Sequence, residues 1–447
     1  MACGADGPAR KRRSQHAGGR CTVLAPDRRL SAVRLSFARH PAPLDSQGHF
    51  MTTQIGATRL AHVQCLPADA PLAVAWQQAA ADIRARLAPW PSDETSSHWR
   101  LYAETPASAG KGDVVWWPFA PQGGAGTAAL VQIDAWRAAG AVVLCSHALA
   151  EGQVQDTLYT ADGVYRVAGA DDPAFFPAFA AFLDCGLVPH DALVLARAWR
   201  TDGSHARPED AHTLGAWPTV LETFPTVLGQ VPSPGRFPAC PSRLGLYPVL
   251  PDADWCERMA DLQVGTVQLR IKDPAHPALR AEIERTVAAG RRVTRNSAWF
   301  INDHWREAAQ ANAYGVHLGQ EDMAALSADE VATLLASGMR LGISTHGYYE
   351  ILAAHHFRPS YLAVGAVFPT TTKVIATAPQ GLAKLARYVK LIAPHYPLVA
   401  IGGIDAGNLA QVLDTGVACA AVVRAVTEAA DVPAAVKSMQ QAFAQRA

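Results

Sequence analysis

The stretch Gly245–Leu269, GLYPVLPDADWCERMADLQVGTVQL, contains the unit that decides the fold of this chain. Apolar runs open and close it, at Gly245–Leu250 and Thr266–Leu269, and the residues between them have helical spacing. A short apolar run followed by a helical pattern indicates a buried strand and a crossover helix. The stretch therefore predicts the first strand–helix–strand unit of a parallel sheet.

The same unit recurs over about 205 residues, which is near the lower size limit of a (β/α)8 barrel. Six further apolar runs lie at Trp299–Ile301, Gly315–Leu318, Leu341–Ile343, Tyr361–Val364, Leu398–Ile401 and Cys419–Val423. Eight strands alternating with helices predict a closed (β/α)8 (TIM) barrel over 241–447. A doubly wound sheet is the alternative, but eight nearly regular units favour closure.

Three segments precede this barrel. Residues 51–200 predict a smaller α/β domain, with a strand at Val114–Phe119, a glycine-rich loop, and a strand at Ala141–Cys145. Helical patterns lie at Trp76–Leu87, Ala128–Ala139, Pro173–Leu183 and Asp191–Arg200. Residues 201–240 are dense in proline, which prevents continuous helix, and we interpret them as a linker.

Residues 1–50 are rich in arginine and show no sustained period, so we expect a disordered leader. One interpretation is an organelle transit peptide, which is typically Arg-rich and poor in acidic residues. The interpretation that we favour is non-native sequence upstream of a true start at Met51.

Charge and composition exclude several classes of protein. The 447 residues include 39 basic and 39 acidic side chains, but nine basic and three acidic ones lie in the first fifty, so the rest is acidic. A nucleic-acid partner, which needs a cationic face, is disfavoured. No apolar stretch is long enough for a membrane span. Eight scattered cysteines without a CxxC pair predict reduced thiols, and hence a cytoplasmic protein. The oligomeric state stays open, a homo-oligomer included.

Polar residues cluster directly after the predicted barrel strands, where the active site of this fold lies. By alternation Gln268, Arg270 and Lys272 point to one side, and an amide with two cations suits a phosphate or pyrophosphate. The alternative is an ordinary solvated strand end. Asp303 and Asp322 follow the third and fourth strands and are candidate Mg²⁺ ligands, because Mg²⁺ prefers one or two carboxylates with water and phosphate oxygens.

Two neighbours of these carboxylates receive other interpretations. Glu321 should point away from Asp322, which favours a supporting role. His317 lies within a strand pattern, and we interpret it as a packed, hydrogen-bonded histidine rather than a catalytic base.

The later strand ends carry small hydroxyls, glycines and further cations. The loop Val367–Lys373 offers threonine hydroxyls and an ammonium group to phosphate oxygens. Glycine amides and a cation after strands seven and eight match the usual phosphate site of these barrels. The candidate residues are Ser344, Thr370, Thr372, Lys373, Gly403, Val423 and Arg424.

On these residues the segment 244–447 resembles thiamine-phosphate synthase. The matching strings are QLRIKD at Gln268–Asp273, FIND at Phe300–Asp303, YGVHLGQED at Tyr314–Asp322, LGISTH at Leu341–His346, VFPTTTK at Val367–Lys373, APQGL at Ala378–Leu382 and AIGGI at Ala400–Ile404. The resemblance implies a transferase of thiamine biosynthesis. Such an enzyme joins 4-amino-5-hydroxymethyl-2-methylpyrimidine diphosphate to a thiazole phosphate, forming thiamine phosphate and releasing pyrophosphate.

The resemblance also implies the roles of the site residues. It assigns the pyrimidine diphosphate to Gln268, Arg270, Lys272, Asn302 and Lys373, with Ser344 on the pyrimidine side. It assigns Mg²⁺ to Asp303 and Asp322. It assigns the thiazole phosphate to Thr370, Thr372, Gly403, Val423 and Arg424. Arg270, Lys272 and Lys373 would be catalytic, because they stabilise the departing pyrophosphate.

One residue departs from the family pattern and leaves part of this assignment open. The family usually has serine where this chain has Arg424, so the contact with the thiazole phosphate must differ. A thiazole tautomerase-like enzyme and a non-catalytic thiamine-ligand-binding barrel are the alternative functions.

The domain before the barrel resembles, weakly, hydroxymethylpyrimidine phosphate kinases of the ribokinase-like fold. The resemblance lies in Gln122–Gly140, QGGAGTAALVQIDAWRAAG. That family has a Gly-Thr-Gly-Cys anion hole, whereas Gly169–Ala174 reads GADDPA. This implies a truncated, inactive relative. A bifunctional kinase–synthase and an unrelated structural α/β module are the alternatives.

Overall fold

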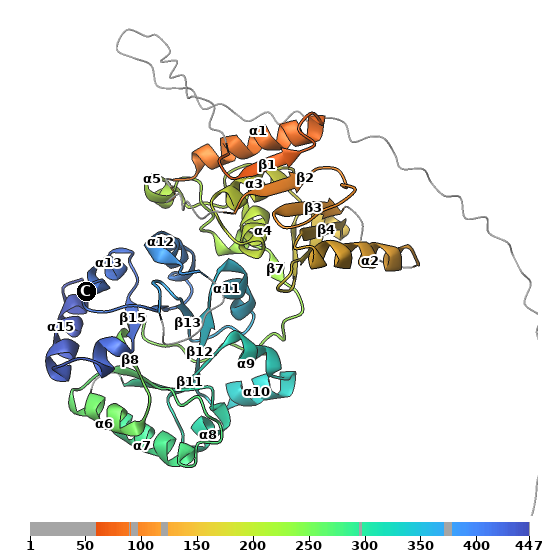
Figure 1. Ribbon diagram of the computed structural model, residues 1–447. Coiled ribbons are helices and arrows are strands. Elements are labelled where there is room, and N and C mark those ends of the chain that lie inside the picture. Colours follow the sequence, from red (N-terminus) through yellow and green to blue (C-terminus); the bar gives the residue numbers. More distant parts are fainter. Residues whose placement is uncertain are drawn as a thin grey trace, which may run out of the picture. The chain divides into compact units, whose positions relative to one another are not determined.

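The computed structural model describes residues 60–88, 90, 97–117, 124–294, 297–370 and 378–446, with the backbone alone at 124–127. The leader expected at 1–50 lies outside them. These residues form two β-sheets, an open sheet of seven strands and a closed barrel of eight (Figure 1).

The barrel has the architecture that the sequence predicts. Its strands are β8 (Gly245–Leu250), β9 (Thr266–Leu269), β10 (Ala298–Asn302), β11 (Gly315–Leu318), β12 (Arg340–Thr345), β13 (Tyr361–Val364), β14 (Leu398–Ile401) and β15 (Cys419–Val422). All adjacent strands are parallel, and β15 pairs with β8 from Cys419↔Gly245 onward, which closes the barrel. The predicted (β/α)8 barrel is confirmed, and closure excludes the doubly wound alternative.

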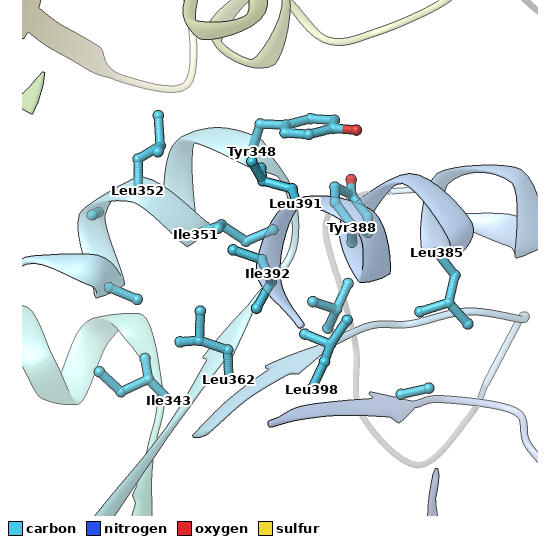
Figure 2. Packing of buried hydrophobic residues seen from close by; sticks show 14 of the residues in the cluster. Ile343, Tyr348, Ile351, Leu352, Leu362, Leu385, Tyr388, Leu391, Ile392 and Leu398 are labelled. Carbon is cyan, nitrogen blue, oxygen red and sulfur yellow. The ribbon is translucent and has the colours of Figure 1, made fainter. Parts of the chain in front are cut away.

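The barrel helices lie outside the strands. They are α6 (Ala253–Asp261), α7 (Leu279–Arg291), α8 (Trp305–Gln310), α9 (Gln320–Ala325), α10 (Ala328–Ala336), α11 (Tyr348–His355), α12 (Gly381–Ile392), α13 (Leu409–Asp414), α14 (Arg424–Thr427) and α15 (Val432–Ala444). Figure 2 shows part of the layer between strands and helices, where Ile343 and Leu362 of the strands lie below Ile351 and Ile392. Burying each such side chain contributes about 1.5–3 kcal/mol.

A second core fills the inside of the barrel. Tyr247, Phe300 and Tyr361 pack there, and the ring centroids of Phe300 and Tyr361 are 5.0 Å apart. Side chains alternate along each strand, so the residues next to these in the same alternation face the interior. This inner core supports the polar side chains at the carboxyl ends of the strands.

The domain before the barrel is a mixed α/β unit. Its elements include β1 (Val63–Leu66), α1 (Pro71–Arg86), β2 (Trp99–Tyr102), β3 (Asp113–Trp117), α2 (Gly124–Ala138), β4 (Val142–Ala148), β5 (Gln153–Tyr159), β6 (Val164–Ala170), α3 (Phe175–Asp184) and α4 (Pro189–Ala198). Strands β1 to β4 pair in parallel, whereas β4 to β7 pair antiparallel. We call residues 60–227 the front domain.

The proline-dense segment 201–240 contributes to the core, which a plain linker does not do. It contains the short helix α5 (Ala211–Leu214) and the strand β7 (Thr226–Val227), which pairs with β6. Trp217 within it is completely buried. Proline limits the segment to these short elements, but its apolar side chains still pack.

His205, in the same segment, makes the stability of the fold depend on pH. It is buried, its Nδ1 accepts the Arg200 N–H at 3.0 Å, and its Nε2 lies 3.0 Å from the Ala216 oxygen. Burial lowers the pKa of His205 from 6.5 to about 4. Because the folded pKa is below the unfolded value, this contribution is fully present above about pH 6.5 and is lost as the pH falls toward 4.

We expect this loss to reach about 3 kcal/mol, since each pKa unit corresponds to about 1.4 kcal/mol. The measurement is the thermal midpoint at pH 7 and pH 4.5. His205→Gln is expected to be less stable at pH 7 but to lose less on acidification than the wild type. His212→Gln, at an exposed position on α5, is the control. An unaltered acid dependence in His205→Gln would refute the assignment.

The described cysteines and helices add two observations. Six cysteines lie in the described residues, all free, and five of them are buried. Among the described helices none has the length and apolar character that a membrane crossing requires.

Candidate active site

The carboxyl ends of four consecutive barrel strands bring the first group of predicted residues together. Gln268 on β9, Asn302 at the end of β10 and His317 on β11 are buried, and Ser344 on β12 is half-buried. The register pairs Asn302 with His317, which places neighbouring side chains at the same level of the barrel. Alternation in each strand directs them into the barrel mouth.

A chain of hydrogen bonds crosses the barrel beneath this mouth. Gln268 Nε2 donates to the Tyr247 hydroxyl at 3.1 Å, which lies 2.9 Å from the Tyr361 hydroxyl. The Tyr361 hydroxyl lies 2.8 Å from His317 Nδ1, and His317 Nε2 lies 2.7 Å from Ser344 Oγ. Burial raises the pKa of both tyrosines, so their hydroxyls stay protonated.

In this series of hydrogen bonds His317 is packed and hydrogen-bonded, as the sequence predicts. Both of its ring nitrogens are engaged, one with Tyr361 and the other with Ser344. Tyr247 and Tyr361 are not among the site residues that the sequence predicts. Their inward positions on β8 and β13 are the signal that could have found them, because a hydroxyl facing the barrel interior needs a partner.

The two predicted carboxylates lie close together, beside a cation. Lys272 Nζ lies 2.6 Å from Asp303 Oδ2. Asp322, in the first turn of α9, accepts the Gly319 N–H at 2.9 Å. Burial raises the pKa of Asp322, the Gly319 amide lowers it, and the adjacent negative charge of Asp303 raises it further. The pair therefore concentrates negative charge that a cation would stabilise.

The backbone at Asp303 has an unusual conformation and is held by two long-range hydrogen bonds. Asp303 has a φ of 64°, in the left-handed region that non-glycine residues rarely adopt. Its N–H donates to the His317 oxygen at 3.0 Å, which ties the end of β10 to β11. His304 Nε2 lies 2.8 Å from the Ile271 oxygen, which ties the same turn to the segment after β9. These contacts bring Lys272 beside Asp303.

The donor set at this mouth suits a divalent cation only if water and substrate oxygens complete its shell. No group of three or more His, Cys, Asp or Glu side chains in the described ranges could hold a metal. A metal held by protein ligands alone is therefore not supported there. Mg²⁺, however, uses one or two carboxylates and completes its shell with water and substrate phosphate oxygens. Asp303 and Asp322 match that requirement.

Asn302 has an unsatisfied donor at this mouth. Its side chain is buried, and among the described residues its Nδ2 has no hydrogen-bond partner. A buried amide without a partner costs about 1–3 kcal/mol. The neighbouring cations, Arg270 (half-buried) and Lys272 (exposed), carry positive charge to the same strand ends. An anionic ligand would satisfy the amide and both cations.

A second group of predicted residues lies at the ends of β13 to β15. Gly403 has a φ of 65°, and a Cβ there would lie 2.7 Å from the Phe368 Cβ and from the Pro369 oxygen. Only glycine allows this approach, which brings the turn after β14 against the segment that leads to Thr370. Arg424 is exposed at the start of α14, and Val423 precedes it. Thr372 and Lys373 lie outside the described residues.

Comparison with known proteins agrees with this geometry. The family model described as thiamine monophosphate synthase matches residues 246–426. A thiamine-phosphate synthase of Escherichia coli (strain CFT073) is 52% identical over 196 residues, which cover 44% of this chain and 90% of the relative. One of Neisseria meningitidis serogroup A is 53% identical over 199 residues, covering 44% and 94%.

Among solved structures, the thiamine phosphate pyrophosphorylase of Pyrococcus furiosus is 30% identical. The match covers 45% of this chain and 96% of that one, with a TM-score of 0.40. Both synthases match this chain over at least 90% of their own length, at 52% and 53% sequence identity. Through its barrel, this chain belongs to the thiamine-phosphate synthase family of transferases.

Proposed function

We propose that the strand ends of the barrel bind the pyrimidine diphosphate through Gln268, Arg270, Lys272 and Asn302. The observation that carries this proposal is the buried Asn302 amide without a partner. Arg270 and Lys272 supply positive charge at the same mouth, where charge-assisted hydrogen bonds to phosphate are stronger than neutral ones. Lys373 joins this set on the strength of the family resemblance.

We further propose that Asp303 and Asp322 hold Mg²⁺ together with the diphosphate oxygens. The support is the contact between the two carboxylates: burial is the main cause that raises the pKa of Asp322, and the charge of Asp303 raises it further. When bound, Mg²⁺ would neutralise charge on the departing pyrophosphate. Lys272 contacts Asp303 and so stands next to the same phosphate oxygens.

The thiazole phosphate is assigned to the opposite part of the mouth. Gly403 and the Val423–Arg424 turn offer backbone amides and a guanidinium, and Thr370 and Thr372 add hydroxyls. The close approach of Gly403 to Phe368 and Pro369 supports this assignment, because it holds the turn after β14 beside the segment that leads to Thr370. Arg424 replaces a neutral hydroxyl by a planar cation and so changes the geometry of the phosphate contact.

The proposed reaction needs charge stabilisation rather than a strong base. When the bond between pyrimidine methylene and pyrophosphate breaks first, the thiazole nitrogen captures the carbocation with its own lone pair, and no proton has to be removed. Arg270, Lys272 and Lys373 stabilise the departing anion. Ser344, fixed by His317, lies on the pyrimidine side. The Asn302 amide and the carboxylate pair favour this synthase over a thiazole tautomerase, which needs no diphosphate site.

Asn302→Leu tests this assignment. Removing a buried donor that has no partner is expected to leave the thermal midpoint unchanged or higher. The kcat/KM for the pyrimidine diphosphate is expected to fall about 10- to 100-fold, since a hydrogen bond to a charged group contributes about 1.5–3 kcal/mol. Asn302→Asp, which keeps the size but adds negative charge, should lose more. A lower midpoint with unaltered kinetics would instead make the amide structural.

The front domain is proposed to be non-catalytic. In a kinase of the resembling family, phosphate binds ahead of the last helices. Here Asp172 Oδ1 already accepts the Ala174 N–H, at 2.8 Å, and the Thr201 hydroxyl, at 2.9 Å. Asp171 adds a second negative charge in the same turn. Arg197 Nη1 lies 3.7 Å from Asp171 Oδ1. The Ala174 and Thr201 donors that could meet a phosphate are thus already bonded to Asp172, which supports an inactive domain.

A further inference from the structure

Helix α11 of the barrel begins without a cap of its own. It starts four residues after Ser344, and its N-cap position is Gly347, which has no side chain to accept the free N–H groups of the first turn. Such groups are normally satisfied by a Ser, Thr, Asp or Asn at the N-cap, and replacing that cap is destabilising.

The cap comes from the front domain. Asp191 lies on α4, and its Oδ1 accepts the Tyr349 N–H at 2.9 Å, which is the bond that an N-cap side chain makes. Asp191 is 2% exposed. A carboxylate supplied 158 positions earlier in the chain thus does the work of a local cap.

Gly347 and Asp191 are matched in space. A Cβ at position 347 would lie 2.4 Å from Asp191 Oδ2 and 2.8 Å from Oδ1. The φ of Gly347 is 176°, an extended conformation open to any residue, so the space alone demands glycine. Glycine at position 347 therefore has two linked effects: it leaves α11 without a cap of its own, and it makes room for the Asp191 side chain that caps the helix instead.

Other contacts join the barrel helices α11 and α12 to the front domain. Trp217 Nε1 donates to the Tyr348 hydroxyl at 2.9 Å. The Arg387 guanidinium of α12 lies over the rings of Trp90 and Trp217, 4.6 and 4.4 Å from their centroids. Lys390 pairs with Asp210 at 2.9 Å. Trp217, Tyr348 and Arg387 are buried, whereas Lys390 is exposed and pairs with a buried Asp210.

The first turn of α11 is coupled to the barrel mouth. Glu350 of that turn accepts the His346 N–H and contacts His346 Nδ1, both at 2.8 Å. Gln320 Nε2 donates to the Ser344 oxygen at 2.7 Å. Ser344 is thus fixed through its hydroxyl by His317, through its carbonyl by Gln320, and through the following residues by α11.

We propose that Asp191 is a positioning residue of the active site: by capping α11 it holds the segment Ser344–Gly347, from the end of β12 to the start of α11, in place, so the front domain completes the barrel's catalytic mouth. This inference rests on the proposed role of Ser344. It gives the front domain a task in the synthase reaction that requires no ligand or chemistry of its own.

The test uses full-length protein and two readouts. Asp191→Ala is expected to speed amide hydrogen exchange in peptides covering 344–352 and to lower kcat/KM for the pyrimidine diphosphate about tenfold, since a small misplacement of a site lowers the rate strongly. Asp191→Asn, which keeps an acceptor, should lose less in both. Asp210→Ala, which removes the ion pair with Lys390, is the matched control and should alter neither.

The decisive variant is a double substitution. Gly347→Ser alone is expected to be harmful, because its Cβ meets Asp191. In the Asp191→Ala background the same serine has room, can cap α11 locally, and is expected to restore both exchange and kcat/KM. Such reversal of sign is the signature of two directly coupled positions.

The outcomes separate this inference from the proposed function. Exchange does not depend on catalysis, so it reports the cap even in an inactive protein. Unaltered exchange in Asp191→Ala overturns the inference, as does faster exchange with unaltered kinetics. If Asp191→Ala fails to fold, the double variant decides: recovery of the fold and activity supports the inference, and no recovery overturns it.

Discussion

Alanine at Asp303 or Asp322 is expected to reduce Mg²⁺-dependent formation of thiamine phosphate by about a thousandfold, through loss of several kcal/mol of charge stabilisation. Each substitution leaves a single carboxylate, while the proposed site uses both. The fold should survive, because removing one member of a like-charged pair relieves the repulsion that helps raise the pKa of Asp322. Asp303→Ala also frees Lys272 from its contact.

The measurement is initial velocity against Mg²⁺ concentration, with thermal melts as the check on folding. Glu321→Ala is the matched control, because this exposed acid is next to Asp322 on the same helix. It should retain near wild-type turnover. Wild-type turnover in both aspartate variants would refute the metal assignment.

Lys272→Ala is expected to lower kcat by about a hundredfold while leaving stability nearly unchanged. The Lys272 side chain is 55% exposed, and an exposed ion pair contributes at most about 1 kcal/mol to folding. Its proposed task lies in the reaction, since an ammonium beside the departing pyrophosphate stabilises charge that develops in the transition state. Removing one such group typically costs about 10²–10³ in rate.

The matched control for Lys272 is Arg280→Ala. Arg280 also forms an exposed ion pair, with Glu284 at 2.9 Å, but on α7. The steady-state kcat and KM of Arg280→Ala should equal those of the wild type. A kcat of Lys272→Ala equal to that of the control would contradict a catalytic role, and a large loss of thermal stability would assign the pair to folding instead.

The barrel could be predicted because its information is local. Each strand is a short apolar run between helical patterns, so periodicity alone located all eight. The β5–β6 hairpin was missed for the opposite reason. Asp156 occupies a buried position in β5, where the pattern calls for an apolar residue. Its partner is Arg197, 41 positions away, whose Nε donates to Asp156 Oδ2 at 2.5 Å.

The same distinction holds at the candidate site. Strand-end residues such as Gln268, Arg270 and Asp303 could be named from their positions alone, whereas Asn302 was named through the family resemblance. The contacts that hold them could not, because Tyr247–Tyr361 and Asp191–Tyr349 join residues 114 and 158 positions apart. Gly347 is an example: nothing in the sequence around it indicates why glycine is needed, and the reason is the Asp191 side chain that packs against it.

The most direct test supplies the full-length protein with the pyrimidine diphosphate, the thiazole phosphate and Mg²⁺, and quantifies both products. We expect thiamine phosphate and pyrophosphate in equal amounts, no turnover with a chelator present, and none when the pyrimidine monophosphate and ATP replace the diphosphate. Binding of the diphosphate without release of pyrophosphate, or equal turnover with the chelator, would contradict it.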